Sequence, residues 1–278
     1  MQILDARRVL SADKRGSSWP VLVETEDGLQ FTKLRGAAQG TGALVAEVIV
    51  AELAEALGLR VPARSLVRFD TVIESDVHND ELLDLLRASA GVNLGFAYLD
   101  GARNFAPPND VELVRRGDAA TILWLDGLTT NLDRTPRNPN LLWWRDALWL
   151  IDHGAALGFQ YALPAVDADA ARRPYTLRGE PHVLQSRVDD AEITRMDEEL
   201  VSRVTSTVVE RAVAAVPDEF LVPLLGREAS PDALRERRMA YVDFLERRVM
   251  APRPFLAPIV LPNEQRRRGR PDWLARRP

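Results

Sequence analysis

A polar loop followed by an apolar hairpin, over residues 131–154, constrains this chain more than any other segment. The loop NLDRTPRN places Asn138 five residues after Asp133. Two apolar runs, LLWW and LWLID, follow the loop, and the Arg-Asp pair between them is typical of a tight turn. These features predict a β-hairpin that carries Asp152 at its far end.

The composition sets the size of the core and excludes several kinds of site. Of the 278 residues, 46% are hydrophobic and 28% are charged, so the chain can bury a substantial core in one large domain or two small lobes. Because there is no cysteine, disulfides, thiolate zinc sites and cysteine nucleophiles are excluded, and a cytoplasmic location is expected. Three scattered histidines argue against a histidine-rich metal cluster.

Neither a membrane nor a nucleic acid is an expected partner. No apolar run approaches the roughly 20 residues of a membrane helix, and charges interrupt the N-terminus where a signal peptide would be apolar. The 36 basic and 41 acidic residues give a net charge of -5, which argues against a broad cationic surface. The arginine run in the tail, 256–278, is interpreted as a solvated, mobile terminus, with contact to an acidic partner or nucleic acid as the alternative.

Periodicity and turn signals predict a chain of mixed secondary structure. A small antiparallel sheet is expected at the start, followed by one further strand, from the ranges 2–10, 20–25, 29–34 and 65–72. Helices are expected over 43–57, capped by Thr41 and ended by Gly58, and over 80–90, 118–129, 190–215, 217–225 and 231–249. The glycine- and proline-rich range 91–108 is the candidate junction between lobes.

The spacing in the loop has a chemical reason. In phosphoryl transfer an aspartate faces the hydroxyl that is phosphorylated, while an asparagine one loop turn away offers an amide oxygen to Mg²⁺. A carboxylate at the end of a strand, as at Asp152, can bridge the metal and the phosphates. Alone, each residue is as well explained as a turn former or a cap. The order of lysine strand, Asp133 and Asn138 loop, hairpin and Asp-x-Gly is the order found in kinases.

These segments resemble the HipA-like kinases over roughly residues 14–250. The resemblance lies in NLDRTPRNPNLL with LWLIDHGAAL, in FTKLRG and in LVAEVIVAELAEALGLRVP. It implies an α+β, two-lobed protein-kinase-like fold that is distantly similar to phosphatidylinositol kinases. The expected parts are a sheet-rich N-terminal lobe over 1–105, a mainly helical C-terminal lobe over 106–255 and the basic tail.

The resemblance also implies roles for five polar residues. Asp133 would orient or deprotonate the acceptor hydroxyl, and Asn138 and Asp152 would hold Mg²⁺. Lys33, one of only two lysines in the chain, would contact the phosphates of ATP, with Glu47 as its partner. Local reasoning agrees, because the helix neighbours of Glu47 are apolar and a carboxylate among them needs a cation. The alternative is that Glu47 reaches solvent at the edge of its helix.

The sequence departs from the family pattern at two positions. Thr135 stands where many relatives have histidine, and His153 replaces the phenylalanine of the Asp-Phe-Gly triplet of protein kinases. We expect His153 to pack under the site, with gating of the site as the alternative. A phosphate-covering turn is expected at Gly16, Ser17 and Ser18, although a short hairpin loop explains these residues equally well. Neither the P-loop motif nor the Gly-x-Ser-x-Gly elbow is present.

The sequence therefore predicts an ATP- and Mg²⁺-dependent kinase. It would transfer the γ-phosphoryl group to a hydroxyl, with a protein serine or threonine as the acceptor that the family suggests. The alternatives are a small-molecule or lipid kinase of the same fold, and a catalytically inactive kinase-fold binding module. The oligomeric state and the identity of the acceptor are not predicted.

Overall fold

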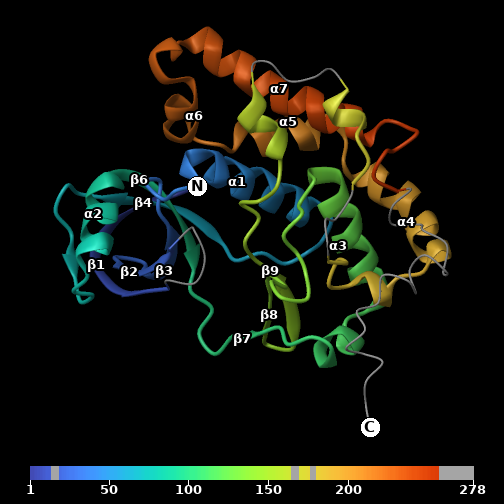
Figure 1. The fold of residues 1–278 in the computed structure, drawn as a ribbon, viewed down its shortest axis with the longest axis horizontal. Coiled ribbons are helices and arrows are strands. Elements are labelled where there is room, and N and C mark those ends of the chain that lie inside the picture. The colour runs from blue at the N-terminus through green and yellow to red at the C-terminus, as the bar shows by residue number, and fades with distance from the viewer. Residues whose placement is uncertain (14–18, 164–168, 176–179, 257–278) are drawn as a thin grey trace.

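A computed structural model describes residues 1–13, 19–163, 169–175 and 180–256. The mixed α+β class expected from the sequence is confirmed (Figure 1). The turn predicted at Gly16, Ser17 and Ser18 lies outside the described residues, as does the basic tail after residue 256.

The N-terminal part forms one curled six-stranded sheet. Its strands are β1 (Ile3–Ala12), β2 (Val21–Thr25), β3 (Gly28–Lys33), β4 (Arg64–Phe69), β5 (Glu74–Ser75) and β6 (Gly91–Ala97). The order is β2-β3-β6-β4-β1-β5, and β1 also pairs with β2. Because β1 pairs in parallel with β4 and β5, the sheet is larger and more mixed than the small antiparallel sheet that was predicted. Parallel pairings join distant segments, so no local turn signal announces them.

Strand β6 occupies the start of the range that was expected to be an irregular junction. It pairs antiparallel with β3 on one side and β4 on the other. A Cβ atom at Gly95 would lie 2.5 Å from Cγ2 of Val67 and 2.7 Å from Oγ of Ser65. The glycine that suggested a loop is therefore explained by close packing between strands.

Two hydrophobic cores lie on the two faces of the sheet. Val9, Val23, Val67 and Phe69 pack with Leu82 of α2 (Asp80–Ala88) on one face. The opposite face joins a larger core that continues into the helical part of the molecule. Alternating residues of β4 thus serve both cores, with Leu66 in the larger core and Val67 and Phe69 in the smaller one.

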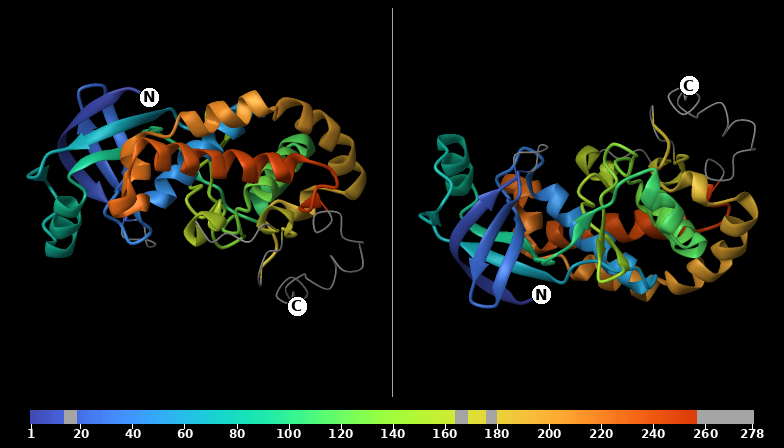
Figure 2. Two further views of the ribbon diagram at one scale, coloured as in Figure 1. Left: turned by 90° about the horizontal axis from the view of Figure 1, so that it is seen from above. Right: turned by 90° about the horizontal axis from the view of Figure 1, so that it is seen from below.

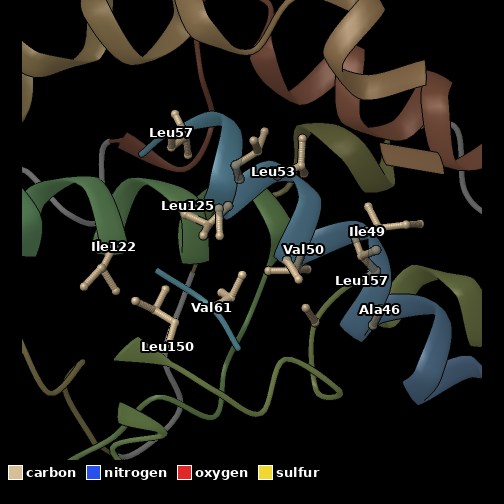
Figure 3. Packing of buried hydrophobic residues seen from close by; sticks show 14 of the residues in the cluster. Ala46, Ile49, Val50, Leu53, Leu57, Val61, Ile122, Leu125, Leu150 and Leu157 are labelled. Atoms are coloured by element: carbon tan, nitrogen blue, oxygen red, sulfur yellow. The ribbon is translucent and has the colours of Figure 1, made fainter. Parts of the chain in front are cut away.

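Helix α1 (Gly40–Ala56) lies within the larger core. It is buried on nearly all sides, and Gly58, at φ 82°, follows its end. Figure 3 shows Ile49, Val50 and Leu53 of α1 close to apolar side chains of the helical part and the hairpin. The predicted cap is wrong, because the helix begins at Gly40 and buried Thr41 lies inside its first turn.

A second, three-stranded antiparallel sheet follows. It contains β7 (Arg103–Asn104), β8 (Leu141–Trp144) and β9 (Ala147–Leu150). The predicted hairpin of β8 and β9 is confirmed, and its turn residues Arg145 and Asp146 both have positive φ, as tight hairpin turns require.

The remaining elements are helical. The α-helices are α3 (Arg116–Thr129), α4 (Asp190–Arg203), α5 (Ser206–Ala214), α6 (Asp218–Leu225) and α7 (Pro231–Val249). Short 3₁₀ helices span Asn109–Leu113, Gly158–Ala162, Ala170–Arg172, Gln185–Arg187 and Gly226–Glu228. The single helical range predicted over 190–215 is broken, because Thr205 caps a new helix by accepting a hydrogen bond from the amide of Val208.

The six-stranded sheet lies at one end of the molecule and α4 at the other, with α1 between them (Figures 1 and 2). Helix α1 contacts α3, α5 and α6. Within the described ranges, no helix combines the length and apolar character needed to cross a bilayer.

Candidate active site

Lys33 is the last residue of β3 and lies opposite Leu94 of β6. Its side chain is only 8% exposed. A buried ammonium requires anionic partners, and Lys33 has two of them. One comes from α1 and the other from the segment after β9.

The partner from α1 is Glu47, whose side chain is fully buried. Lys33 Nζ donates a short hydrogen bond to Glu47 Oε1. The second oxygen, Oε2, has no partner among the described residues. The structure thus brings together the pair that the sequence suggested, and Glu47 does not reach solvent.

The partner after β9 is Asp152. Its Oδ1 accepts a hydrogen bond from Lys33 Nζ over 2.6 Å, and its side chain is 39% exposed. The backbone of Asp152 has φ 57°, in the left-handed region, so the chain turns sharply at this residue. Buried Lys33 is therefore joined to a carboxylate that also faces solvent.

The electrostatics of this group reflect two carboxylates around one ammonium. Burial alone would lower the pKa of Lys33, but Glu47 and Asp152 raise it above its ordinary value. Burial raises the pKa of Glu47 more than Lys33 lowers it. For Asp152 the ammonium outweighs burial, and the pKa of this carboxyl falls. Lys33 and Asp152 are therefore both charged at neutral pH.

Asp133 lies on the loop that the sequence singled out. Its Oδ2 accepts hydrogen bonds from Nδ2 of Asn138 over 2.7 Å and from Nδ2 of Asn140 over 3.3 Å. The Asn140 amide also lies 3.5 Å from the carbonyl oxygen of Asp152. Asn140 therefore links the loop of Asp133 to the segment of Asp152, and through it to Lys33.

The loop is held by its own polar groups. The amide of Thr135 donates to the carbonyl of Asn138, and the amide of Asn138 donates to both the carbonyl and the hydroxyl of Thr135. Asn131 Oδ1 accepts from the amide of Asp133 over 3.1 Å. Thr135 thus contributes a hydroxyl that closes the turn.

Sequence reasoning missed Asn140 and Arg134. Asn140 is buried, has φ 51° and accepts a 2.5 Å hydrogen bond from Arg134 through its carbonyl. The signal for Asn140 was present, because asparagine tolerates positive φ and here follows a proline. Arg134 gave no such signal, since it looked like one more arginine in an arginine-rich chain.

His153 is buried, as the packing interpretation expected. Its Nδ1 lies 3.3 Å from Nη2 of Arg134. Burial and the neighbouring Arg134 lower the pKa of His153 to about 3, so the imidazole is neutral.

The donor set at this site fits a magnesium ion. Asp152 offers a partly exposed carboxylate and exposed Asn138 an amide oxygen, and Mg²⁺ prefers oxygen ligands. Two carboxylates face one ammonium, so a further cation beside Asp152 is favourable. In the described parts of the chain, no three histidine or acidic side chains gather as a metal cluster.

A hollow of about 380 Å³ lies on the sheet. It is lined by Ser11, Ala12, Asp13, Pro20, Leu22, Phe31 and Tyr98. Phe31 lies two residues before Lys33 on β3, so the two side chains leave the same face of the strand. Phe31, which lines the hollow, therefore lies on the same face of β3 as Lys33.

Comparison with family models shows the family of this chain. The profile described as HipA-like kinase matches residues 6–222, which is most of the chain. A solved structure, that of the Helicobacter pylori proinflammatory kinase CtkA, is similar with a TM-score of 0.49 and 13% sequence identity. That similarity covers 86% of this chain and 95% of the CtkA chain. No curated protein matches the sequence.

Proposed function

Because this chain belongs to the HipA-like kinase family, we propose that it transfers the γ-phosphoryl group of ATP to the hydroxyl of a protein serine or threonine. The observation that carries the proposal is the meeting of five residues from β3, α1 and the range 133–152. Lys33 contacts Glu47 and Asp152, and the amide of Asn140 lies within reach of both Asp152 and Asp133. Phosphoryl transfer depends on positioning and charge neutralisation, which such a group can supply.

In this proposal Lys33 opposes the charge of the ATP phosphates. Glu47 acts on the nucleotide only through Lys33, because it is fully buried in α1 and holds the ammonium in place. Asp152 and Asn138 hold the metal. Mg²⁺, when bound, supplies positive charge to the phosphates and aligns them for transfer.

Asp133 is the proposed catalytic base. Both amides that contact it donate to Oδ2, and no described residue donates to Oδ1. The free oxygen can accept the proton of the attacking hydroxyl, while the two amides fix the plane of the carboxylate. Once the hydroxyl oxygen bonds to the γ-phosphorus, ADP leaves with the electron pair of the broken bond.

The hollow on the sheet suggests where the nucleobase binds. Leu22, Phe31 and Tyr98 offer apolar surface for a flat ring, and the phosphates would then extend along β3 toward Lys33. The proposed lobes are 1–105 and 106–255, and the contact of Lys33 with Asp152 supports a place for the phosphates between them.

The test uses purified full-length chain with γ-labelled ATP and Mg²⁺. Label transfer is measured to the chain itself, to proteins of a cell extract, to lipid vesicles and to a set of small alcohols. We expect label on protein serine or threonine. Asp133→Ala should lower the rate at least about 100-fold, the usual contribution of a general base. Nucleotide binding should persist in this variant, because Lys33 and Asp152 are unchanged.

Asp70→Ala is the matched control, since Asp70 is an exposed carboxylate in a loop away from the site. Label on a lipid or on a small alcohol instead would show that the acceptor is not a protein. Full turnover by Asp133→Ala would contradict the assignment of the base. Failure of the wild-type chain to bind ATP would favour a binding module instead.

A further inference from the structure

A buried polar network lies beneath the loop that carries Asp133. At its centre is Asp126 of α3, which is fully buried. Arg134 Nε donates to Asp126 Oδ2 over 2.6 Å, His182 Nε2 lies 2.9 Å from the same oxygen, and Asn131 Nδ2 donates to Oδ1 over 3.1 Å. Asp126 thus binds two residues that flank Asp133 and one residue about fifty positions further along the chain.

Arg134 extends the network to both sides of the site. It directly follows Asp133, and its Nη1 donates to the carbonyl of Asn140 over 2.5 Å. Its Nη2 lies 3.3 Å from His153, the residue after Asp152. One guanidinium therefore ties α3 to the far end of the loop and to the segment of Asp152, a geometry that the planar fork of arginine allows.

The charges in the network balance when His182 is neutral. The amide of Leu184 donates to His182 Nδ1 over 3.1 Å, so Nδ1 is an acceptor and Nε2 carries the proton donated to Asp126. Burial lowers the pKa of His182, and Arg134 and His182 lower that of Asp126 in spite of its burial. The cluster therefore contains one carboxylate, one guanidinium and a neutral imidazole.

Tyr175 supports the same loop from a second point. Its buried hydroxyl donates to the carbonyl of Asn131 over 2.7 Å, and the amide of Val183 donates to the carbonyl of Arg134. Tyr175 and Val183 thus contact the loop on both sides of Asp133, and neither of them nor His182 contacts Lys33 or Glu47 within the described residues.

We propose that Asp126, Tyr175 and His182 are positioning residues, which hold the loop through Asn131 and Arg134 so that Asp133 faces the acceptor hydroxyl. A buried ion pair costs desolvation and stabilises little compared with apolar packing, so geometry is the better reason for its presence. The inference rests on the proposed function, since the position of Asp133 matters only if it takes part in the reaction.

Two substitutions of one residue separate positioning from stability. In His182→Gln the amide nitrogen lies near the place of Nε2, so the donor to Asp126 is kept. In His182→Asn the side chain can still accept from Leu184, but the donor to Asp126 is lost. We expect His182→Asn to lower kcat for label transfer about 10- to 100-fold, with the KM for ATP unchanged within about twofold. His182→Gln should restore most of the rate.

Tyr175→Phe is the milder variant, because it removes one hydroxyl and keeps the ring. We expect a smaller loss of kcat, about three- to tenfold, with the KM for ATP again unchanged. If His182→Asn does not fold, Tyr175→Phe is the variant that tests the positioning role. Denaturant unfolding of each variant shows whether the loss of rate follows the loss of stability.

The inference is overturned if the foldable variants keep the wild-type kcat while Asp133→Ala is inactive. It is also overturned if His182→Gln and His182→Asn lose rate equally and in proportion to their loss of stability. If Asp133→Ala keeps its turnover, the proposed function fails instead, so the two failures are distinguishable.

Discussion

At the end of β3, the ammonium of Lys33 faces two carboxylates that differ in their exposure to solvent. Glu47 is enclosed by α1, whereas Asp152 is partly open to solvent. Glu47 can therefore fix the lysine, while Asp152 remains accessible to a metal ion. This difference in burial separates the structural partner of Lys33 from the partner that can change its contacts when a nucleotide and Mg²⁺ bind.

Lys33→Arg tests whether the compact ammonium is required. The guanidinium is larger and planar, so in this buried space it cannot contact Glu47 and Asp152 as a single nitrogen does. We expect kcat/KM for ATP to fall at least about tenfold, which corresponds to about 1.4 kcal/mol. Steady-state kinetics with varied ATP measures this loss.

Arg87→Lys is the matched control, because Arg87 is exposed and its ion pair with Asp84 lies on the surface of α2. Its kinetics should equal those of the wild type. An unchanged kcat/KM in Lys33→Arg would show that any cation serves at position 33.

At the scale of elements, β6 shows how a packing requirement can resemble a loop signal. Its glycine allows β4 and β6 to approach closely, in the strand next to β3 and Lys33. The close approach belongs to the pairing of strands that are more than twenty residues apart. The sequence around Gly95 contains no trace of the side chains of Ser65 and Val67 that require it.

Gly95→Ala should therefore destabilise the chain by about 1–3 kcal/mol, since the new methyl group would overlap Val67 and Ser65. Chemical denaturation monitored by circular dichroism measures the free energy of unfolding. Gly117→Ala in α3 is the control, because the new Cβ would meet only the end of the Met196 side chain, at 4.0 Å. Equal effects of the two substitutions would contradict the packing explanation.

Local patterns predicted the parts of the site that depend on neighbours in sequence. The hairpin before Asp152 follows from two apolar runs and a turn, and the pairing of Glu47 with a cation follows from the apolar surroundings of its helix. His182 could not be found in this way. It reaches Asp126 across 56 positions, and neither residue has a neighbour that suggests the other. The polar contacts beneath Asp133 thus follow from tertiary structure.

At the scale of the whole molecule, α1 connects the two ends. It follows β3 in sequence, lies in the core shared with α3 and the hairpin, and contacts α5 and α6 (Figures 1 and 3). Lys33 comes from the sheet, Glu47 from α1, and Asp152 from the segment after the hairpin. A ligand that binds Lys33 and Asp152 therefore contacts the sheet and the segment after the hairpin directly, and α1 through Glu47.

Such a ligand should stabilise the chain as one unit. With a non-hydrolysable ATP analogue and Mg²⁺ at 100 times the Kd, the gain is about 2.7 kcal/mol. We expect the Tm to rise by about 5 °C or more in a single transition, measured by calorimetry. Asp152→Ala should lose the part of the rise that depends on Mg²⁺ and keep the part that the nucleotide gives alone. Asp70→Ala should keep both parts, and a Mg²⁺ increment that survived in Asp152→Ala would remove this carboxylate from the metal site.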